Sequence, residues 1–469
     1  MALNLDAVPT VLADGTSFEE LINPDDHTIS LRLFTDPEIY RWELERVFTR
    51  SWIVLAHESE VPNPGDYVSR SIGQDPVIVS RDEDGKVHVL LNVCAHRGMQ
   101  VCRAEYGHTS TFRCPYHGWI YGLDGSLRGL PAKNEIYGDR LDKDDFGLVE
   151  ARVEVYAGMV WATWDARTPE LFDYLGDFKF YLDVAFNRSD LGMEVVGPPQ
   201  RWVMPANWKF AADQFAGDGY HVVTLHRSMK DIGLLGSIED MKQILYGVDV
   251  GFPEGHGLRC LPTNWRGLQL DSDSKNGSSN GSELSIREKL AYVVPAGLTR
   301  EMIDEPLRLL TPDQLRLLTD FPPIVGQIFP TAAWINDGSL LDGALKPSAA
   351  ISWRTWIPRG PGEMEVLYWS MVEKGAPESH KDAMRKAAIQ VFTSSGLIDQ
   401  DDAEVWSGTQ RVIGGVMAQA QRSTYHGLLG EIKPDGWPGG GLVYDGPSAD
   451  DNQWLWWMRY SDFMTNKVW

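Results

Sequence analysis

Two short motifs, each with one cysteine and one histidine, carry the clearest chemistry in the chain. One residue separates Cys94 from His96 and two separate Cys114 from His117, with seventeen residues between the two motifs. Because thiolates and imidazoles are present in equal number, the four side chains could bind a tetrahedral zinc ion or a [2Fe–2S] cluster. In such a cluster, both cysteines bind one iron and both histidines bind the other.

Three features of these motifs favour the cluster over zinc. Structural zinc sites usually pair like ligands, whereas each motif here supplies one cysteine and one histidine. The Cys-x-His spacing is also short for a zinc knuckle. Gly98, Pro115 and Gly118 flank the ligands, as expected where backbone N–H groups must approach the cluster sulfurs. The complete pattern resembles the Rieske signature, which implies a [2Fe–2S] cluster; a zinc ribbon is the alternative.

A second group of candidate ligands consists of Asp218, His221 and His226. On a helix, Asp218 and His221 would share a face, whereas His221 and His226 would point about 140° apart. Both histidines can therefore bind one metal only if the helix distorts or ends between them, which Gly217 and Gly219 would permit. Two imidazoles and one carboxylate would leave positions open on Fe(II) for O2 and substrate. Two ordinary histidines without a metal are the alternative.

Over nearly its whole length, the chain resembles the large (α) subunit of the Rieske non-haem iron aromatic-ring-hydroxylating dioxygenases, of the naphthalene and biphenyl dioxygenase type. The family's iron motif, Asp-x2-His followed by a second histidine, is matched by Asp218, His221 and His226. The resemblance places the third iron ligand in the segment FTSSGLIDQDDAEVW, at Asp402, with Asp401 as the fallback.

The same resemblance implies a ring of α subunits in which the cluster of one subunit lies near the iron of the next. Asp218 would then link the iron ligand His221 to the cluster ligand His117 of a neighbouring subunit. Asp451 would similarly contact His96 of a neighbour. The implied catalytic group is Asp218, His221, His226 and Asp402.

An apolar substrate pocket is also implied by the resemblance. The family often has asparagine four residues before the bridging aspartate, where this chain has Gln214. Small residues at 216 and 219 would suit a substrate of two or more rings, whereas Arg259 or Arg266 could hold an aromatic carboxylate such as phthalate. The substrate class stays open between these two. The implied pocket residues are Gln214, Phe215, Ala216, Gly219, Val222, Phe392 and Ile398.

The activity implied by the resemblance is oxidation of an aromatic ring by O2 to a cis-dihydrodiol, as in the catabolism of aromatic hydrocarbons. The implied cofactors are one Rieske [2Fe–2S] cluster and one mononuclear Fe(II), with electrons from NAD(P)H through a reductase and usually a ferredoxin. A small β subunit is the implied partner, in an α3β3 assembly. A Rieske monooxygenase or demethylase would share both metal sites, whereas an electron-transfer protein would need only one small domain.

The fold class indicated is α+β, with a small all-β domain before a larger domain of helices and antiparallel strands. β-rich runs at 77–80 and 87–93 and a hairpin at 119–127 lie around the cluster motifs. The predicted division is an arm and helix at 1–48 that pack on the catalytic domain, a Rieske domain at 49–167 and an iron-binding catalytic domain at 168–469, for which the resemblance implies a helix-grip, START-like fold.

The composition excludes several other classes of function. With a net charge of −23 over 469 residues, the chain is a poor partner for nucleic acids and anionic membranes. Its four cysteines indicate no disulfide framework, its first twenty residues show no basic region followed by an apolar core, and no apolar run approaches the length of a membrane span. We therefore expect a soluble cytoplasmic protein in which thiolate ligands stay reduced. The polar segment 267–285 is expected to form a mobile surface loop or lid.

Metal analysis of the anaerobically purified protein tests both sites. We expect about three irons and about two acid-labile sulfides per chain, with the EPR signal of a histidine-ligated cluster after reduction by dithionite. About two irons with about two sulfides would mean that the mononuclear site holds no metal. Zinc without sulfide would rule out the oxygenase interpretation.

Overall fold

The computed structural model describes residues 9–231, 247–263, 284–341, 347–432, 436–446 and 449–469. The chain divides into two compact units, one of Arg41–Leu171 with Trp469 and one of Val8–Tyr40 with Phe172–Val468. The predicted borders after residues 48 and 167 stay predictions. Among the described residues, no helix is long and apolar enough to cross a membrane.

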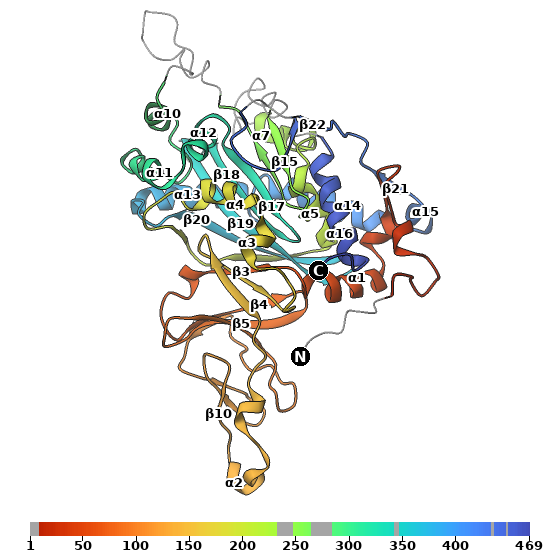
Figure 1. Cartoon of the computed structure of the whole chain (residues 1–469), viewed down its shortest axis with the longest axis vertical. Helices are drawn as coiled ribbons and strands as arrows, with labels where there is room; N and C mark the ends of the chain where they lie inside the picture. The colour runs from red at the N-terminus through yellow and green to blue at the C-terminus, as the bar shows by residue number, and fades with distance from the viewer. Residues whose placement is uncertain (1–8, 232–246, 264–283, 342–346, 433–435, 447–448) are drawn as a thin grey trace, which may run out of the picture. The chain divides into compact units, whose positions relative to one another are not determined.

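The smaller unit consists mainly of short antiparallel strands (Figure 1). Four form a sheet in the order β6-β5-β4-β7, and two three-stranded sheets have the orders β10-β9-β8 and β11-β12-β3. The predicted hairpin is confirmed, because β9 and β10 pair across a turn in which Gly125 has a φ of 79°. The strands are β3 (Ile53–His57), β4 (Asp66–Ile72), β5 (Asp75–Arg81), β6 (Val87–Leu91), β7 (Tyr106–His108), β8 (Phe112–Arg113), β9 (Ile120–Tyr121), β10 (Leu127–Gly129), β11 (Arg152–Tyr156) and β12 (Met159–Thr163).

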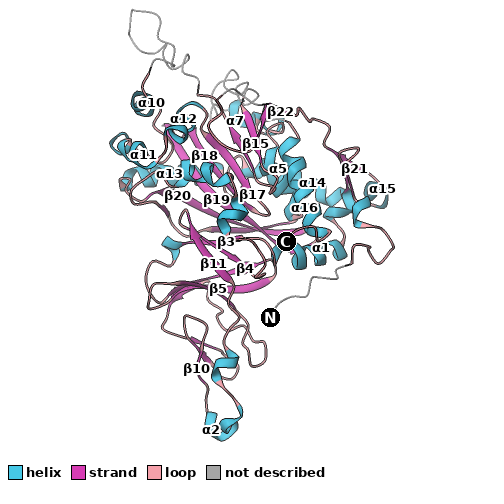
Figure 2. Cartoon of the chain, viewed as in Figure 1, coloured by secondary structure: helices cyan, strands magenta, loops and turns pink. Residues whose placement is uncertain are grey.

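The larger unit is organised around one ten-stranded antiparallel sheet (Figure 2). Nine strands follow the order β13-β20-β19-β18-β17-β16-β15-β23-β22, and β14 also pairs with β20. The predicted α+β class with a large antiparallel sheet is therefore confirmed. The strands are β13 (Met193–Val195), β14 (Gln200–Met204), β15 (Val248–Gly251), β16 (Gly257–Cys260), β17 (Pro323–Ile328), β18 (Ala332–Leu341), β19 (Pro347–Gly360), β20 (Glu363–Glu373), β22 (Glu431–Ile432) and β23 (Leu442–Asp445).

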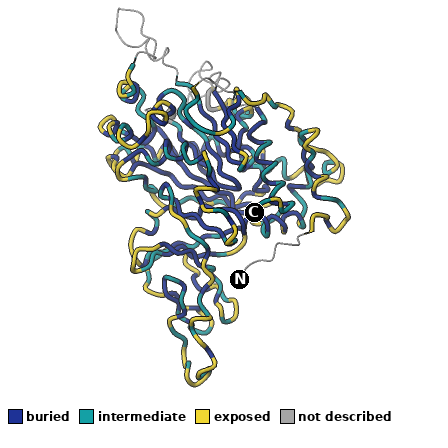
Figure 3. Tube along the Cα trace, in the orientation of Figure 1, coloured by how far each residue is buried: buried dark blue, intermediate teal, exposed yellow. Residues whose placement is uncertain are grey.

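The central strands of this sheet form part of the hydrophobic core of the larger unit. Every residue of β20 after Glu363 is buried, and Figure 3 shows the neighbouring central strands buried as well. Because consecutive side chains of a strand point to opposite faces, both faces of β20 are covered. A separate small sheet joins the N-terminal segment to the C-terminal third through β1 (Ile22–Asn23), β2 (Thr28–Ser30) and β21 (Arg422–Thr424).

Helices of the larger unit pack on the sheet and carry the candidate site. Helix α5 (Trp208–Gly217) packs on β16, β17 and β19, and α13 (Glu378–Val391) packs on β19 and β20. Helix α16 (Asp451–Met464) packs on α5, where the rings of Trp208 and Trp456 lie 5.7 Å apart. The remaining helices include α1 (Pro37–Glu43), α3 (Leu171–Leu175), α4 (Phe178–Phe186), α6 (Val222–Leu225), α7 (Arg227–Asp231), α10 (Ile286–Tyr292), α11 (Asp304–Leu309), α12 (Pro312–Asp320), α14 (Asp399–Ile413) and α15 (Val416–Gln419).

His256 is a fully buried histidine that connects three segments of this core. Its Nδ1 accepts the backbone N–H of Phe329 at 3.0 Å, so its Nε2 carries the proton and donates to the carbonyl of Tyr174 at 2.9 Å. Burial lowers the pKa of His256 to about 4, with a smaller contribution from the Arg459 charge and against the effect of the Tyr174 bond. The imidazole is therefore neutral in the folded protein near pH 7.

Acid should weaken the fold through His256. Because the pKa of a histidine is about 6.5 when it is unfolded, the unfolded chain binds this proton first, and stability falls as the pH drops from about 6.5 towards about 4. The loss should reach about 3 kcal/mol. In H256N, whose amide oxygen can still accept the Phe329 N–H but does not titrate, the melting temperature should depend less steeply on pH than in the wild type. The exposed His426 supplies the control H426N, and equal slopes in H256N and the wild type would contradict this account.

Candidate metal sites and the cavity beside them

The two Cys–His motifs form two similar loops in the smaller unit. Cys94 follows β6 and Cys114 follows β8, and both thiols are buried. In each loop a glycine with positive φ turns the chain back: Gly98 (72°) donates its N–H to the Cys94 carbonyl and Gly118 (73°) to the Cys114 carbonyl. The flanking glycines thus close the two ligand loops.

All four predicted cluster ligands gather at these loops. The imidazole rings of His96 and His117 lie 4.4 Å apart, and His96 stacks on Trp119 at 4.8 Å. The Nδ1 atom of His96 is buried and has no hydrogen-bond partner among the described residues. Burial, followed by the charges of His117 and Arg97, lowers the pKa of His96. A neutral imidazole with an unpaired buried nitrogen fits a metal ligand, so this donor set fits a [2Fe–2S] cluster.

Tyr121 is a cluster neighbour that sequence reasoning missed. Its hydroxyl accepts the backbone N–H of Ala95 at 3.1 Å and lies 3.2 Å from the Sγ of Cys94. The hydroxyl can therefore donate to the sulfur, an interaction that tunes iron–sulfur centres. Its position in β9, directly after the second motif, is the only signal that the sequence offered.

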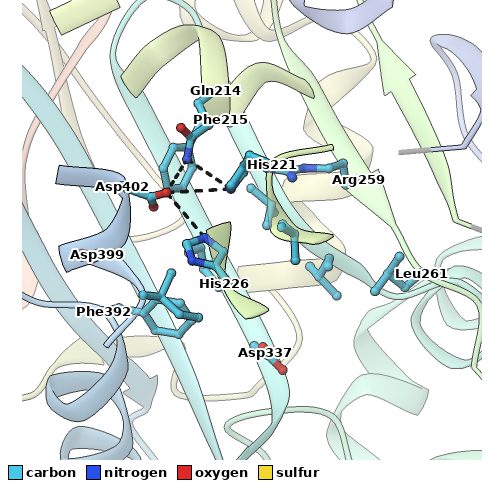
Figure 4. Close-up of a pocket in the computed structure, with 15 residues that line it drawn as sticks. Gln214, Phe215, His221, His226, Arg259, Leu261, Asp337, Phe392, Asp399 and Asp402 are labelled. Carbon is cyan, nitrogen blue, oxygen red and sulfur yellow. Dashed lines mark hydrogen bonds and ion pairs between the residues drawn. The ribbon is translucent and has the colours of Figure 1, made fainter. Parts of the chain in front are cut away.

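His221, His226 and Asp402 converge in the larger unit. One ligand atom from each lies within 4.8 Å of the others. Asp402 Oδ1 lies 3.5 Å from His226 Nε2 and 3.8 Å from His221 Nε2 (Figure 4). Two imidazole nitrogens and one carboxylate oxygen facing a common point suit a divalent iron with further positions open.

The end of a short helix between the two histidines makes this convergence possible. Helix α5 ends at Gly217, before both of them, and His221 and His226 flank the single turn α6. Because α6 ends at Leu225 and His226 has a φ of −93° and a ψ of 16°, the helix ends between the two histidines, as their spacing requires. Asp402 comes from the first turn of α14.

The electrostatics of the site favour metal-binding forms of these side chains. Burial and, to a smaller extent, the charge of His221 together lower the pKa of His226 to about 4, against the opposing effect of Asp401. His226 is therefore neutral at physiological pH, as a ligand must be. Burial raises the pKa of Asp402, a shift that a bound cation would offset by favouring the carboxylate. The fallback Asp401 lies 3.4 Å from the other ring nitrogen of His226, Nδ1.

Asp218 contacts His221 on the side away from Asp402. Its Oδ2 lies 3.2 Å from His221 Nδ1, and its Oδ1 accepts the backbone N–H of His221 at 3.1 Å. Burial by itself raises the pKa of Asp218, but the bonds and charge of His221, with the charge of Arg259, lower it below the ordinary value. An ionised Asp218 can therefore orient the His221 ring.

A cavity of about 140 Å³ opens beside the three ligands (Figure 4). Five of the predicted pocket residues line it, whereas Ala216 and Gly219 do not. Gly219 lies between α5 and α6, where its N–H donates to the Gly217 carbonyl and it has no side chain to reach the cavity. The lining residues are Gln214, Phe215, His221, Val222, His226, Arg259, Leu261, Ile324, Val325, Ile335, Asp337, Phe392, Ile398, Asp399 and Asp402.

Arg259 is buried at the edge of this cavity and is engaged by the protein itself. Its Nη1 donates to the backbone carbonyl of Asp218 at 2.8 Å, and on the sheet it pairs with Asp249 of β15. Burial lowers the pKa of Arg259, while the carboxylates of Asp249, Asp218 and Asp402 oppose that shift. Arg266 and most of the predicted loop 267–285 lie outside the described residues.

The carboxylate of Asp451 forms hydrogen bonds within its own unit. Its carboxylate accepts the backbone N–H groups of Leu429 at 2.9 Å and Gly430 at 3.1 Å. A contact with His96 of a neighbouring subunit stays a prediction.

Family models match both parts of the chain: the Rieske [2Fe-2S] domain over residues 51–151 and the ring hydroxylating alpha subunit (catalytic domain) over residues 180–426. The chain is 33% identical to the α subunit of biphenyl 2,3-dioxygenase from Rhodococcus jostii (strain RHA1), over 89% of this chain and 84% of the relative. It is also 33% identical to the α subunit of N,N-dimethyl phenylurea N-demethylase from Sphingobium sp. (strain YBL2), over 93% of this chain and 91% of the relative.

The fold agrees with a solved structure of the same family. Naphthalene 1,2-dioxygenase from Rhodococcus sp., bound to indole, superposes with a TM-score of 0.82 and 38% identity, covering 96% of this chain and 97% of that chain. The chain therefore belongs to the α subunits of the Rieske aromatic-ring-hydroxylating dioxygenases, with a Rieske [2Fe–2S] domain and a His-His-Asp mononuclear iron site.

Proposed function

We propose that this α subunit cis-dihydroxylates an uncharged aromatic hydrocarbon of two or more rings. The observation that carries the proposal is the cavity beside His221, His226 and Asp402, whose other walls are mostly aliphatic and aromatic. Phe215 and Phe392 line it from α5 and from the segment after α13. Such walls exclude water and bind flat apolar rings.

The metal centres supply the redox chemistry: when bound, the cluster passes single electrons and the iron activates O2. The protein's part is to hold the ring of the substrate against the site and to keep the ligands in their binding forms. Cys94, His96, Cys114 and His117 would hold the cluster, and His221, His226 and Asp402 the iron. Asp218 would orient His221 and link it to His117 of a partner subunit.

The partners follow from the same proposal. Electrons would come from NAD(P)H through a reductase and a ferredoxin. A small β subunit would complete an α3β3 assembly in the cytoplasm, as the family resemblance implies. The net charge of −23 would suit a redox partner with a basic surface.

The charges around the cavity disfavour an aromatic carboxylate as substrate. Arg259 already donates to the Asp218 carbonyl and lies in the field of three carboxylates. Asp337, Asp399 and Asp402 also line the cavity. Among the described residues that line the cavity, Arg259 carries the one guanidinium, and a substrate carboxylate would compete with these groups for it, so a neutral ring fits better.

Oxidative N-demethylation is a second candidate function. It is supported by the relative from Sphingobium sp. (strain YBL2), an N,N-dimethyl phenylurea N-demethylase α subunit as similar to this chain as the biphenyl dioxygenase. Both reactions can use the same cluster and the same iron ligands, so the product decides between them.

Product analysis tests the proposed substrate class. With reductase and ferredoxin supplied, naphthalene and biphenyl should give cis-dihydrodiols, because both are apolar and need no cation for binding. Phthalate should give no product under the same conditions. Turnover of phthalate in preference to naphthalene would overturn the assignment, and formaldehyde release from an N,N-dimethyl phenylurea would favour the demethylase.

The iron ligands are tested by removing one carboxylate. The iron content of the D402A variant should be about two per chain instead of about three, because two neutral imidazoles bind Fe(II) weakly without an anionic ligand. The EPR signal of the reduced cluster should not change. E404A is the matched control, since Glu404 is an exposed acid on the same helix, α14. Full iron content in D402A would show that another residue completes the site.

A further inference from the structure

Gln214 connects the ligand Asp402 to an indole that does not line the cavity. Trp406 Nε1 donates to Gln214 Oε1 at 2.8 Å, and Gln214 Nε2 donates to Asp402 Oδ1 at 2.9 Å. The exposed fractions of Gln214, Asp402 and Trp406 are 7%, 3% and 6%, so water competes little for these bonds. Figure 4 shows the amide of Gln214 directed at the Asp402 carboxylate.

The indole decides which way the amide of Gln214 points. An indole N–H can only donate, so it must face the amide oxygen. The amide nitrogen then faces Asp402 and also lies 3.3 Å from His221 Nε2. In the opposite orientation, the amide oxygen would face a carboxylate oxygen and two N–H groups would face each other. Trp406 therefore excludes the orientation in which Gln214 could not support Asp402.

The arrangement depends on the length of the side chain at 214 and on helix geometry. Asp402 and Trp406 are four residues apart on α14, so they share one face of that helix. Gln214 approaches them from α5 and spans the gap between the indole and the carboxylate. Asparagine is one methylene shorter and would leave one of the two bonds unmade.

We propose that Trp406 is a positioning residue of the iron site. It fixes the amide of Gln214, and the amide holds the Asp402 carboxylate in the orientation that binds the metal. With His221 Nε2 bound to the metal, the amide would lose its contact there and would keep its bond to Asp402. The proposal rests on the iron site alone, so it stands or falls independently of the substrate assigned above.

Release of the mononuclear iron tests this role without measuring turnover. The iron-loaded holoenzyme is mixed with ferrozine, and capture of Fe(II) is followed while EPR of the reduced cluster checks the smaller unit. W406F and Q214M should each release this iron about tenfold to hundredfold faster than the wild type, the usual effect of losing a group that orients a metal ligand. The cluster signal should stay the same.

The double variant separates positioning from packing. If Trp406 acts through Gln214, W406F should accelerate iron release in the wild-type background and add nothing in the Q214M background. An equal acceleration in both backgrounds, or none in either, would overturn the proposal. W437F makes the same chemical change at an indole that bonds to Tyr181, and it should leave iron release unchanged.

Q214L tests the proposal even if W406F does not fold. Its side chain can neither accept the indole N–H nor donate to Asp402, so it should lose iron as fast as Q214M. Iron retention in Q214L at the wild-type rate would overturn the proposal, since the amide donor would then be dispensable. Thermal melting of each variant distinguishes faster release from unfolding.

Discussion

The iron site depends on the short helix α6, which lies between His221 and His226 and ends at Leu225. Two histidines five residues apart on a continuous helix would point in different directions. Because α6 ends before His226, whose φ is −93° and ψ 16°, the two imidazole rings approach within 5.1 Å of each other, measured between ring centroids. An earlier break, the end of α5 at Gly217, frees Asp218 to contact His221 Nδ1 and exposes its carbonyl to Arg259.

The sheet and its covering helices hold this break in place. Helix α5 lies between the strands β16, β17 and β19 on one side and α16 on another, so the segment before the break is buried. Asn452 of α16 donates to the carbonyls of Ala216, at 3.3 Å, and Val250, at 3.2 Å. Added atoms at Gly217 or Gly257 would collide with Asn452 or with the Ala216 carbonyl. Glycine at these positions therefore permits the close approach of strand, helix and break.

Buried charge is the second constraint on the site. Burial raises the pKa of Asp249 well above its ordinary value, with Arg259 as the opposing positive charge. Arg259 thus offsets the negative charges of Asp249 on β15 and Asp218 at the end of α5. A cation at the edge of the cavity therefore does not by itself indicate an anionic substrate. A divalent ion bound by His221, His226 and Asp402 would add positive charge where carboxylates are concentrated.

The sequence by itself determined the features that depend on residues close together in the chain. The cluster ligands lie in two loops closed by Gly98 and Gly118, and the need for a break between His221 and His226 follows from helical spacing. The family resemblance had already indicated Asp402 as the third ligand, but only the tertiary structure brings its carboxylate to both histidines. The tertiary structure alone decided that Trp406 bonds to Gln214 and that Arg259 donates to the Asp218 carbonyl. The physical reason is distance along the chain: Asp402 and Gln214 are 188 residues apart, and only the packing of α14 and α5 brings their side chains together.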